Sequence, residues 1–162
     1  MKVRDVMSAT PFFCKPDTNL CSAAELLWKL DFGMLIIVND DQKVLGVVTD
    51  RDMFIALGTR NELPGTIAVG AIRSGKVHIC HADDDIHAAL ATMAREKVRR
   101  LPVVNQEGQL EGILSMDDVV AHSQRQGAGR APELSFEDVV ETLKKVYAPW
   151  APLATQGRAA FA

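Results

Sequence analysis

Two short stretches of the sequence place the same reactive side chains at the same spacing. Each begins with a glycine and an apolar run, continues to a hydroxyl residue, and reaches an aspartate three positions later. The first stretch reads GVVTDRD and contains Thr49 and Asp52; the second reads GILSMDD and contains Ser115 and Asp118. This spacing is compatible with two kinds of chemistry.

In the structural interpretation, the hydroxyl residue caps a helix and the aspartate completes a capping box. In the ligand-binding interpretation, a strand running into a helix start presents free backbone N–H groups at a positive dipole end, which suits a phosphate. The aspartate then supplies acceptor oxygens that match the vicinal hydroxyls of ribose. Spacing alone favours capping, although capping does not require the preceding glycine and apolar strand in both stretches.

The elements that position these residues belong to an internal repeat. Shifting the sequence by 66 positions aligns identical residues without a gap, and the pairs include Val3 with Val69, Cys14 with Cys80, Asn39 with Asn105, Gly46 with Gly112, and Asp52 with Asp118. Two copies at this long period indicate a tandem duplication rather than a solenoid. Because each copy is small for an independent core, we expect the two halves to share an interface.

Each half predicts the order strand, helix, strand, strand, helix. In the first half, Asp17 or Thr18 can cap a helix that ends at Gly33, and a second helix runs from about Asp50 to Leu57 and stops at Gly58. In the second half, the helices are predicted near 86–96 and 116–123. The predicted domains are residues 1–58 and 67–123, joined by a linker at 59–66.

A further helix is predicted outside the repeat. Residues 124–134 read as a flexible tether, residues 135–147 as an amphipathic helix, and residues 148–162 as a tail without periodic signal. Ser135 and Asp138 can form a capping box at the helix start. The helix can pack on its own module or dock a partner or sister subunit, and we favour self-packing or a dimer contact.

The composition narrows the function. The chain has 162 residues, 48% of them hydrophobic and 24% charged, which indicates a globular protein. A net charge of −3 argues against nucleic-acid binding, which needs a dense basic face. Three cysteines without a CxxC pair favour a reducing compartment, so we expect a cytoplasmic protein. No apolar run approaches the roughly 20 residues that span a bilayer, so no membrane segment is expected.

Metal and catalytic sites are disfavoured. Cys14 and Cys80 are expected to be buried strand residues. His78, Cys80, His81 and His87 lie near three aspartates, but strand alternation turns His81 away from the face shared by His78 and Cys80, and the closed four-ligand spacing of zinc is missing. No histidine is placed by sequence as a general base for a serine. We therefore expect no metal, no obligatory cofactor and no catalysis.

Taken together, the paired GVVTDRD and GILSMDD motifs, the VRDVM opening, the PDTNL and DDDIH helix starts and the RRLPVV strand resemble two cystathionine β-synthase (CBS) domains in tandem, a Bateman module. The resemblance covers residues 3–123. It implies an α+β fold of two β-α-β-β-α repeats, packed sheet to sheet with pseudo-two-fold symmetry. It also implies two clefts that bind AMP, ADP, ATP or S-adenosylmethionine, and association into a homodimer.

The resemblance also implies site residues. Thr49 with Asp52, and Ser115 with Asp118, would contact ribose and phosphate. The adenine would lie against residues of the second strand of each half, which are Met34, Leu35, Ile36, Leu101, Pro102 and Val103. Arg99 and Arg100 would reach phosphates, with Arg51 and Lys76 as further candidates. Because the first half has Gly33 and Met34 in place of the two arginines, we expect the clefts to be non-equivalent.

The sequence therefore predicts a ligand-sensing regulatory module without catalysis of its own. Ligand binding would change the angle between the two halves, and an unidentified protein partner would respond to that change. The alternative is a dimerising interaction scaffold whose clefts are vestigial, with the helix at 135–147 as its working surface.

Overall fold

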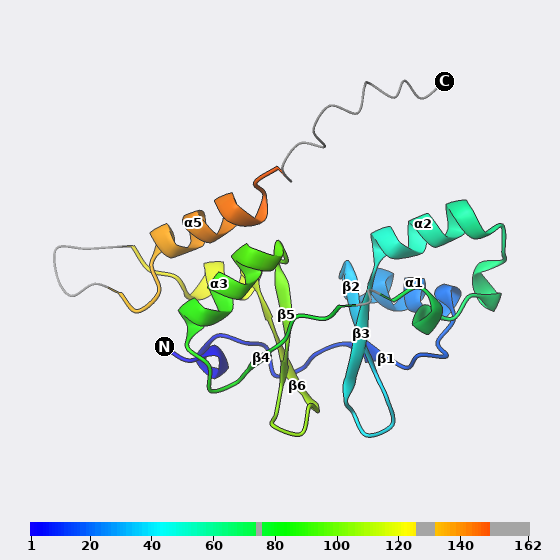
Figure 1. The fold of residues 1–162 in the computed structure, drawn as a ribbon, viewed down its shortest axis with the longest axis horizontal. Helices are drawn as coiled ribbons and strands as arrows, with labels where there is room; N and C mark the ends of the chain where they lie inside the picture. The colour runs from blue at the N-terminus through cyan, green and yellow to red at the C-terminus, as the bar shows by residue number, and fades with distance from the viewer. Residues whose placement is uncertain (74–75, 126–131, 150–162) are drawn as a thin grey trace.

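The computed structural model describes residues 1–73, 76–125 and 132–149. Most of the predicted tether and of the predicted tail lies outside these residues. Within them, the chain forms two lobes, each built on a three-stranded sheet (Figure 1). The predicted α+β fold with two repeated β-α-β-β-α units is confirmed.

The first repeat contains β1 (Phe13–Cys14), α1 (Leu20–Leu30), β2 (Met34–Val38), β3 (Val44–Thr49) and α2 (Asp50–Arg60). The strands lie in the order β1-β2-β3, with β1 parallel and β3 antiparallel to the central β2. The second repeat has the same topology and contains β4 (Cys80–His81), α3 (Ile86–Glu96), β5 (Arg100–Val104), β6 (Leu110–Ser115) and α4 (Met116–His122).

The helix ends of the first repeat differ from the sequence expectation. Asn19, rather than Asp17 or Thr18, caps α1 by accepting a hydrogen bond from the Ser22 amide at 3.0 Å. Asp31 takes the left-handed conformation at the end of α1 with φ 52°. Helix α2 continues through Gly58 to Arg60, because one glycine costs a helix only about 1 kcal/mol.

The segments that precede the two repeats are exchanged. The 3₁₀ turn η1 (Val3–Asp5) packs on the second repeat, where the Val3 amide donates to the Asp84 carbonyl at 2.9 Å and Val3 is fully buried. Reciprocally, η3 (Val69–Ala71) follows η2 (Pro64–Thr66) and packs on the first repeat, where the Val69 amide donates to the Thr18 carbonyl at 2.8 Å. The core of each lobe therefore includes the segment that precedes the other repeat in the sequence.

The two sheets meet through their inner faces. In β2, Leu35 and Ile37 pack toward α1 and α2, whereas Ile36 and Val38 pack against Ile113 of β6. This division follows from the alternation of side chains along a strand. The hairpins also touch at their tips, where the Val44 amide donates to the Gly108 carbonyl at 3.2 Å. The sheet-to-sheet packing predicted from the resemblance is confirmed.

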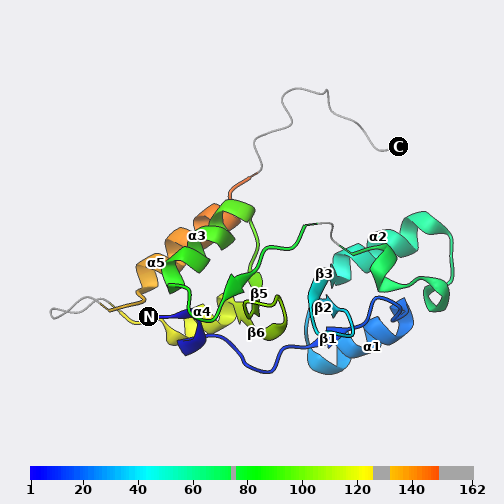
Figure 2. The same cartoon turned by 60° about the horizontal axis from the view of Figure 1, so that its bottom comes forward.

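Helix α5 (Phe136–Val146) lies along α3 and also contacts α4 (Figure 2). Its predicted capping box is present, with Ser135 accepting from the Asp138 amide at 3.1 Å. Val139 and Val146 are buried in the core of the second repeat, and Leu143 packs against it. Of the two packing alternatives, α5 therefore adopts the one on its own module.

Candidate functional site

A cavity of about 480 Å³ opens between the two repeats. Two pairs of neighbouring elements form it: the start of β2 with the junction of β3 and α2, and the start of β5 with the segment before β4. The lining residues are Gly33, Met34, Val47, Thr49, Asp50 and Arg51 of the first repeat, and Lys76, Val77, His78, Lys97, Val98, Arg99, Arg100 and Pro102 of the second. This volume is within the range of small-molecule sites in proteins.

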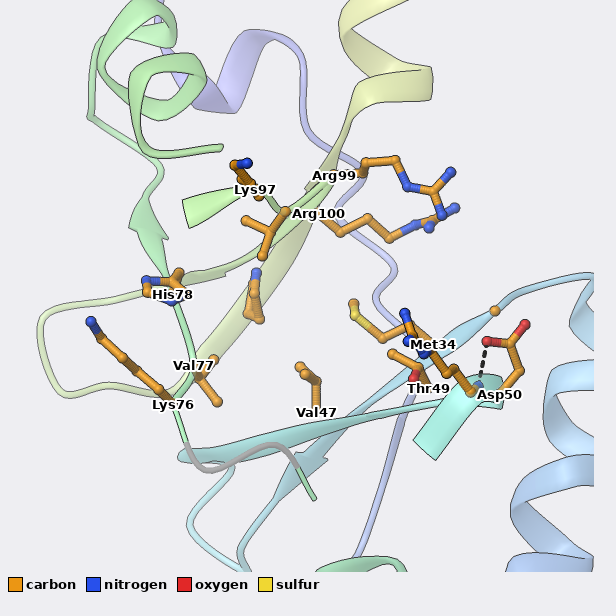
Figure 3. A pocket seen from close by; sticks show the side chains of 14 residues that line it. Met34, Val47, Thr49, Asp50, Lys76, Val77, His78, Lys97, Arg99 and Arg100 are labelled. Atoms are coloured by element: carbon orange, nitrogen blue, oxygen red, sulfur yellow. Dashed lines mark hydrogen bonds between the residues drawn. The ribbon is translucent and has the colours of Figure 1, made fainter. Parts of the chain in front are cut away.

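The lining has a pronounced charge imbalance. Five of the lining residues are lysine or arginine, and a single one, Asp50, is a carboxylate, although the whole chain has a net charge of −3. Figure 3 shows Arg99 and Arg100 extending in the same direction from β5, with Met34 and Thr49 below them and Lys76 and His78 on the opposite wall. The cavity thus combines an apolar floor with a cationic rim.

Both repeated motifs form reciprocal capping boxes. The Asp52 carboxylate accepts from the Thr49 amide at 2.9 Å and from the Thr49 hydroxyl at 2.7 Å, while the Asp52 amide donates back to that hydroxyl at 3.1 Å. Ser115 and Asp118 repeat the arrangement: the Ser115 amide donates to the Asp118 carboxylate at 2.9 Å, and the Asp118 amide donates to the Ser115 hydroxyl at 3.1 Å. The capping interpretation therefore describes these residues, and each aspartate uses its Oδ2 atom for the cap.

The amides at the start of α2 are largely engaged within the fold. The Asp50 amide donates to the Gly33 carbonyl at 3.2 Å, and the Arg51 amide donates to the Asp50 carboxylate at 2.7 Å. In the second repeat, the Met116 amide donates to the Arg99 carbonyl at 2.9 Å. An anion in this cavity therefore meets mainly the side-chain cations.

The two arginines at the start of β5 have different surroundings. Arg100 is partly buried, with its guanidinium carbon 5.7 Å from the centre of the Phe32 ring and Nη2 3.3 Å from an Asp117 oxygen. Its buried Nε has no hydrogen-bond partner among the described residues. Arg99 is exposed and donates from Nη1 to the Tyr147 hydroxyl at 3.2 Å.

The other predicted site residues lie in several places. Leu35, Ile36, Leu101 and Val103 are fully buried in the cores, while Met34 and Pro102 line the cavity. Asp52 borders a separate hollow of about 320 Å³ beside α2. Ser115 is buried at 7% exposure, and Asp118 lies beside it at the start of α4. The cavity thus collects Thr49, Met34, Arg51, Lys76, Arg99, Arg100 and Pro102 from the predicted set.

Several lining residues were not expected from the sequence, notably Lys97, His78 and Asp50. Lys97 takes the left-handed position after α3, with φ 54°, as Asp31 does after α1. The sequence did contain a signal for Lys97. It aligns with Asp31 at the end of the helix that precedes the central strand, and a residue at that position lies beside the start of the strand that forms the site.

The repeated glycines have a packing role. A Cβ atom at Gly112 would lie 2.7 Å from the Ser8 carbonyl oxygen, because the exchanged N-terminal segment crosses β6 there. A Cβ at Gly46 would lie 2.8 Å from Cδ of Arg73, in the corresponding exchanged segment. Close approach of the exchanged segments explains why glycine precedes both motifs, which capping does not.

Two of the three cysteines, Cys14 and Cys80, behave as apolar core residues, whereas Cys21 is exposed. Cys14 and Cys80 are buried, and burial raises the pKa of Cys14 to about 11. Burial, together with the charge of Asp84, raises the pKa of Cys80 to about 12. Within the described ranges, no three His, Cys, Asp or Glu side chains are grouped in a way that could hold a metal ion.

Residues 3–59 and 69–125 each match the CBS domain, and the chain belongs to the CBS domain family. Hypoxic response protein 1 of Mycobacterium tuberculosis is 31% identical over 119 residues, which are 74% of this chain and 82% of that protein. An uncharacterized protein of Methanopyrus kandleri is 28% identical over 120 residues, and the match spans 72% of this chain but 57% of that protein.

A third relative, the inosine-5′-monophosphate dehydrogenase of Mycobacterium tuberculosis, is 30% identical over 120 residues. This match spans 73% of the present chain and 21% of the enzyme. The similarity to that enzyme is therefore confined to a minor part of its length.

Among the solved structures that are similar to this fold are two with related sequences. Hypoxic Response Protein I with two coordinated zinc ions has a TM-score of 0.70 at 29% identity, over 76% of this chain and 100% of that chain. CBSX2 in complex with AMP has a TM-score of 0.66 at 28% identity, over 74% and 93% of the two chains. Of the helices in the described part of this chain, none is long and apolar enough to cross a membrane.

Proposed function

We propose that this protein binds an adenosine-containing anion in the cavity between its two repeats and regulates a partner in response. The observation that carries the proposal is the cationic rim of five lysine and arginine side chains around an apolar floor, in a chain that is acidic as a whole. The similar CBSX2 structure in complex with AMP supports the ligand class.

We propose a partner in the lining for each part of the ligand. The apolar side chains of Met34, Val47 and Pro102 offer a surface for a purine ring. Arg100 and Lys76 supply charge-assisted donors for phosphate, which are stronger than neutral ones. Thr49 lines the cavity at the junction of β3 and α2 and would lie beside the ribose, whereas Asp118 lies outside the cavity lining.

The proposed role is sensing without catalysis. AMP and ATP share the purine and ribose but differ in charge, so their competition for one cationic cavity would report adenylate energy state. A ligand that binds one inter-repeat angle better than another shifts the population toward that angle. The partner that responds is an unidentified protein.

Calorimetric titration with AMP, ADP, ATP and S-adenosylmethionine tests this proposal. We expect binding of at least one nucleotide, and a loss of affinity of about tenfold or more in Arg100→Gln and Lys76→Gln, since hydrogen bonds to charged groups contribute about 1.5–3 kcal/mol. Arg95→Gln is the matched control, because Arg95 is an exposed cation of α3 outside the cavity. Absence of binding by AMP, ADP and ATP, or equal losses in Arg95→Gln, contradicts the proposal; binding of S-adenosylmethionine alone also contradicts it, because that compound has no phosphate and carries a positive sulfonium.

A second candidate function is a dimerising scaffold, and the outer face of α1 and α2 favours it. Trp28 is 87% exposed and Phe54 is 77% exposed on this face. They border a hollow together with Leu27, Phe32, Met53 and Leu57. Large exposed apolar patches of this kind mark association sites. A second copy of the chain, paired through the same face about a two-fold axis, would bury both aromatic rings.

Sedimentation equilibrium separates this candidate from a monomeric sensor. We expect a dimer in the unmodified protein and a monomer in the Trp28→Glu, Phe54→Glu double variant. The control is Val120→Glu, which places the same charge on an exposed apolar residue of α4. A monomeric unmodified protein at high concentration contradicts the scaffold function but leaves nucleotide sensing intact.

A further inference from the structure

The C-terminal end of α5 is attached to the rim of the cavity. Arg99 donates from Nη1 to the Tyr147 hydroxyl at 3.2 Å, and Lys97 donates from Nζ to the Ala148 carbonyl at 2.7 Å and to the Pro149 carbonyl at 3.2 Å. Both cations line the cavity, and all three acceptors lie directly after α5. Two of the five cationic side chains of the rim are therefore already bonded to the segment outside the repeats.

The rest of α5 is attached differently. At its start, the Phe136 amide donates to the Gln124 carbonyl at 3.1 Å, and along its length Val139 and Val146 are buried against the second repeat. The Nε2 atom of His87 on α3 lies 3.6 Å from the Oδ2 atom of Asp138 on α5. These contacts are independent of the cavity, so the end of α5 can detach from the rim while the rest of the helix stays packed.

A phosphate competes with these attachments. Arginine binds phosphate best through two parallel N–H bonds, and a phosphate that takes Nη1 of Arg99 as one of these donors competes with the neutral Tyr147 hydroxyl for it. The ammonium of Lys97 likewise interacts more strongly with a phosphate than with neutral carbonyls. Because Tyr147 is 63% exposed, its release buries no new polar group and exposes little apolar surface.

We propose that the segment directly after α5, residues 147–149, is a built-in competitor of the ligand, so that an anion bound in the cavity releases this segment. The inference rests on the proposed function, since it requires an anionic ligand on the rim. Under this proposal, the conformational change that a partner protein would detect is the release of residues 147–149 when an anion binds in the cavity. Binding of the ligand and binding of a partner to the released segment are thermodynamically linked. The partner therefore increases ligand affinity by the same factor by which the ligand increases partner affinity.

Tyr147→Phe tests the competition, because it removes the acceptor hydroxyl and keeps the ring. We expect calorimetric ATP affinity to rise about two- to fivefold, which corresponds to a net hydrogen bond of about 0.5–1 kcal/mol. Adenosine, which lacks phosphate, should bind both proteins equally. Val140→Ala, at an exposed position of the same helix, is the control and should leave the affinity for ATP unchanged. Hydrogen exchange adds a structural readout: saturating ATP should accelerate exchange of the amides at 146–148.

The outcomes separate the two proposals. If ATP binds, but Tyr147→Phe has unchanged or weaker affinity, the competition is wrong and the proposed ligand site stands. Unchanged or slower exchange at 146–148 on addition of ATP also overturns the competition. If neither the unmodified protein nor Tyr147→Phe binds any of AMP, ADP, ATP or S-adenosylmethionine, the proposed function itself fails, and the competition fails with it.

Discussion

The outer helical faces of the two repeats have different surroundings. In the first repeat, α1 and α2 leave Trp28 and Phe54 exposed, whereas in the second repeat α5 packs along α3 and contacts α4, and Val120, which aligns with Phe54, stays 51% exposed. The helix-facing sides of the two sheets are alike, since both sheets bury the same strand positions there. The duplication therefore preserved the pattern that forms the core, while the outer surfaces acquired separate roles.

A second difference concerns the start of the central strand. Gly33 and Met34 precede or begin β2, and Arg99 and Arg100 occupy the equivalent positions of β5. The positive charge of the inter-repeat cavity is therefore contributed mainly by the second repeat. This asymmetry suits a module in which one cleft holds the charged part of a ligand.

The largest effect is expected on the covered face. Val139→Asp places a charge at a position that is 6% exposed, in contact with the core of the second repeat. We expect the free energy of unfolding to fall by about 3 kcal/mol. The matched variant Val140→Asp, at a position 48% exposed on the same helix, should change it by less than about 0.5 kcal/mol. Urea denaturation measures both, and equal effects would mean that α5 does not cover this face in solution.

The next effect distinguishes the repeated glycines. Gly112→Ala forces a methyl group against the Ser8 backbone carbonyl, whereas Gly46→Ala meets the flexible side chain of Arg73. Overpacking of this kind costs about 1–3 kcal/mol, and we expect that cost at Gly112. The loss at Gly46 should be clearly smaller, because the Arg73 side chain can move aside. Thermal unfolding of the two variants provides the comparison, and a larger loss at Gly46 would contradict the exchanged N-terminal segment.

The capping boxes should show no such asymmetry. Thr49→Ala and Ser115→Ala each remove the side-chain oxygen that accepts from the amide of the aspartate three residues later. Each should cost about 1 kcal/mol, the usual value for an N-cap. Chemical denaturation of the two single variants tests this expectation. A loss confined to one variant would show that the two motifs, although identical in geometry, differ in their role.

The smallest effect is the pH dependence of α5. Burial raises the pKa of Asp138, but the Ser135 hydroxyl and amide and the nearby His87 ring together hold it below its usual 3.8. A lowered carboxylate pKa stabilises the fold above pH 3.8, and this contribution is lost as the pH falls through the folded-state pKa. Protection of the α5 amides from hydrogen exchange should therefore decrease in acid. Asp138→Asn should flatten this dependence, and an unchanged acid response in that variant would contradict the assignment.

The duplication made much of the fold predictable. The gapless offset and the strand and helix patterns placed α3 at Ile86–Glu96, as observed. Helix ends were less predictable: Asn19 caps α1, and Gly58 lies within α2. The exchange of the segments around Val3 and Val69 has no local signal, because it depends on which lobe each segment reaches in three dimensions.

The sequence predicted the repeated motifs of the site, but it did not predict which residues line the cavity. Strand alternation places Met34 at the cavity while Leu35 is in the core, although both belong to one predicted apolar run. Arg99 and Tyr147 are 48 positions apart in the sequence, and the packing of α5 on α3 brings them together. Such long-range contacts do not follow from local periodicity.

Photolabelling with 8-azido-ATP tests the central claim most directly, because it identifies the residues next to the bound purine. The account predicts labelled peptides from residues 33–51 and 76–102, together with protection of these peptides by unlabelled ATP. Saturable labelling confined to other parts of the chain would contradict a nucleotide site between the repeats.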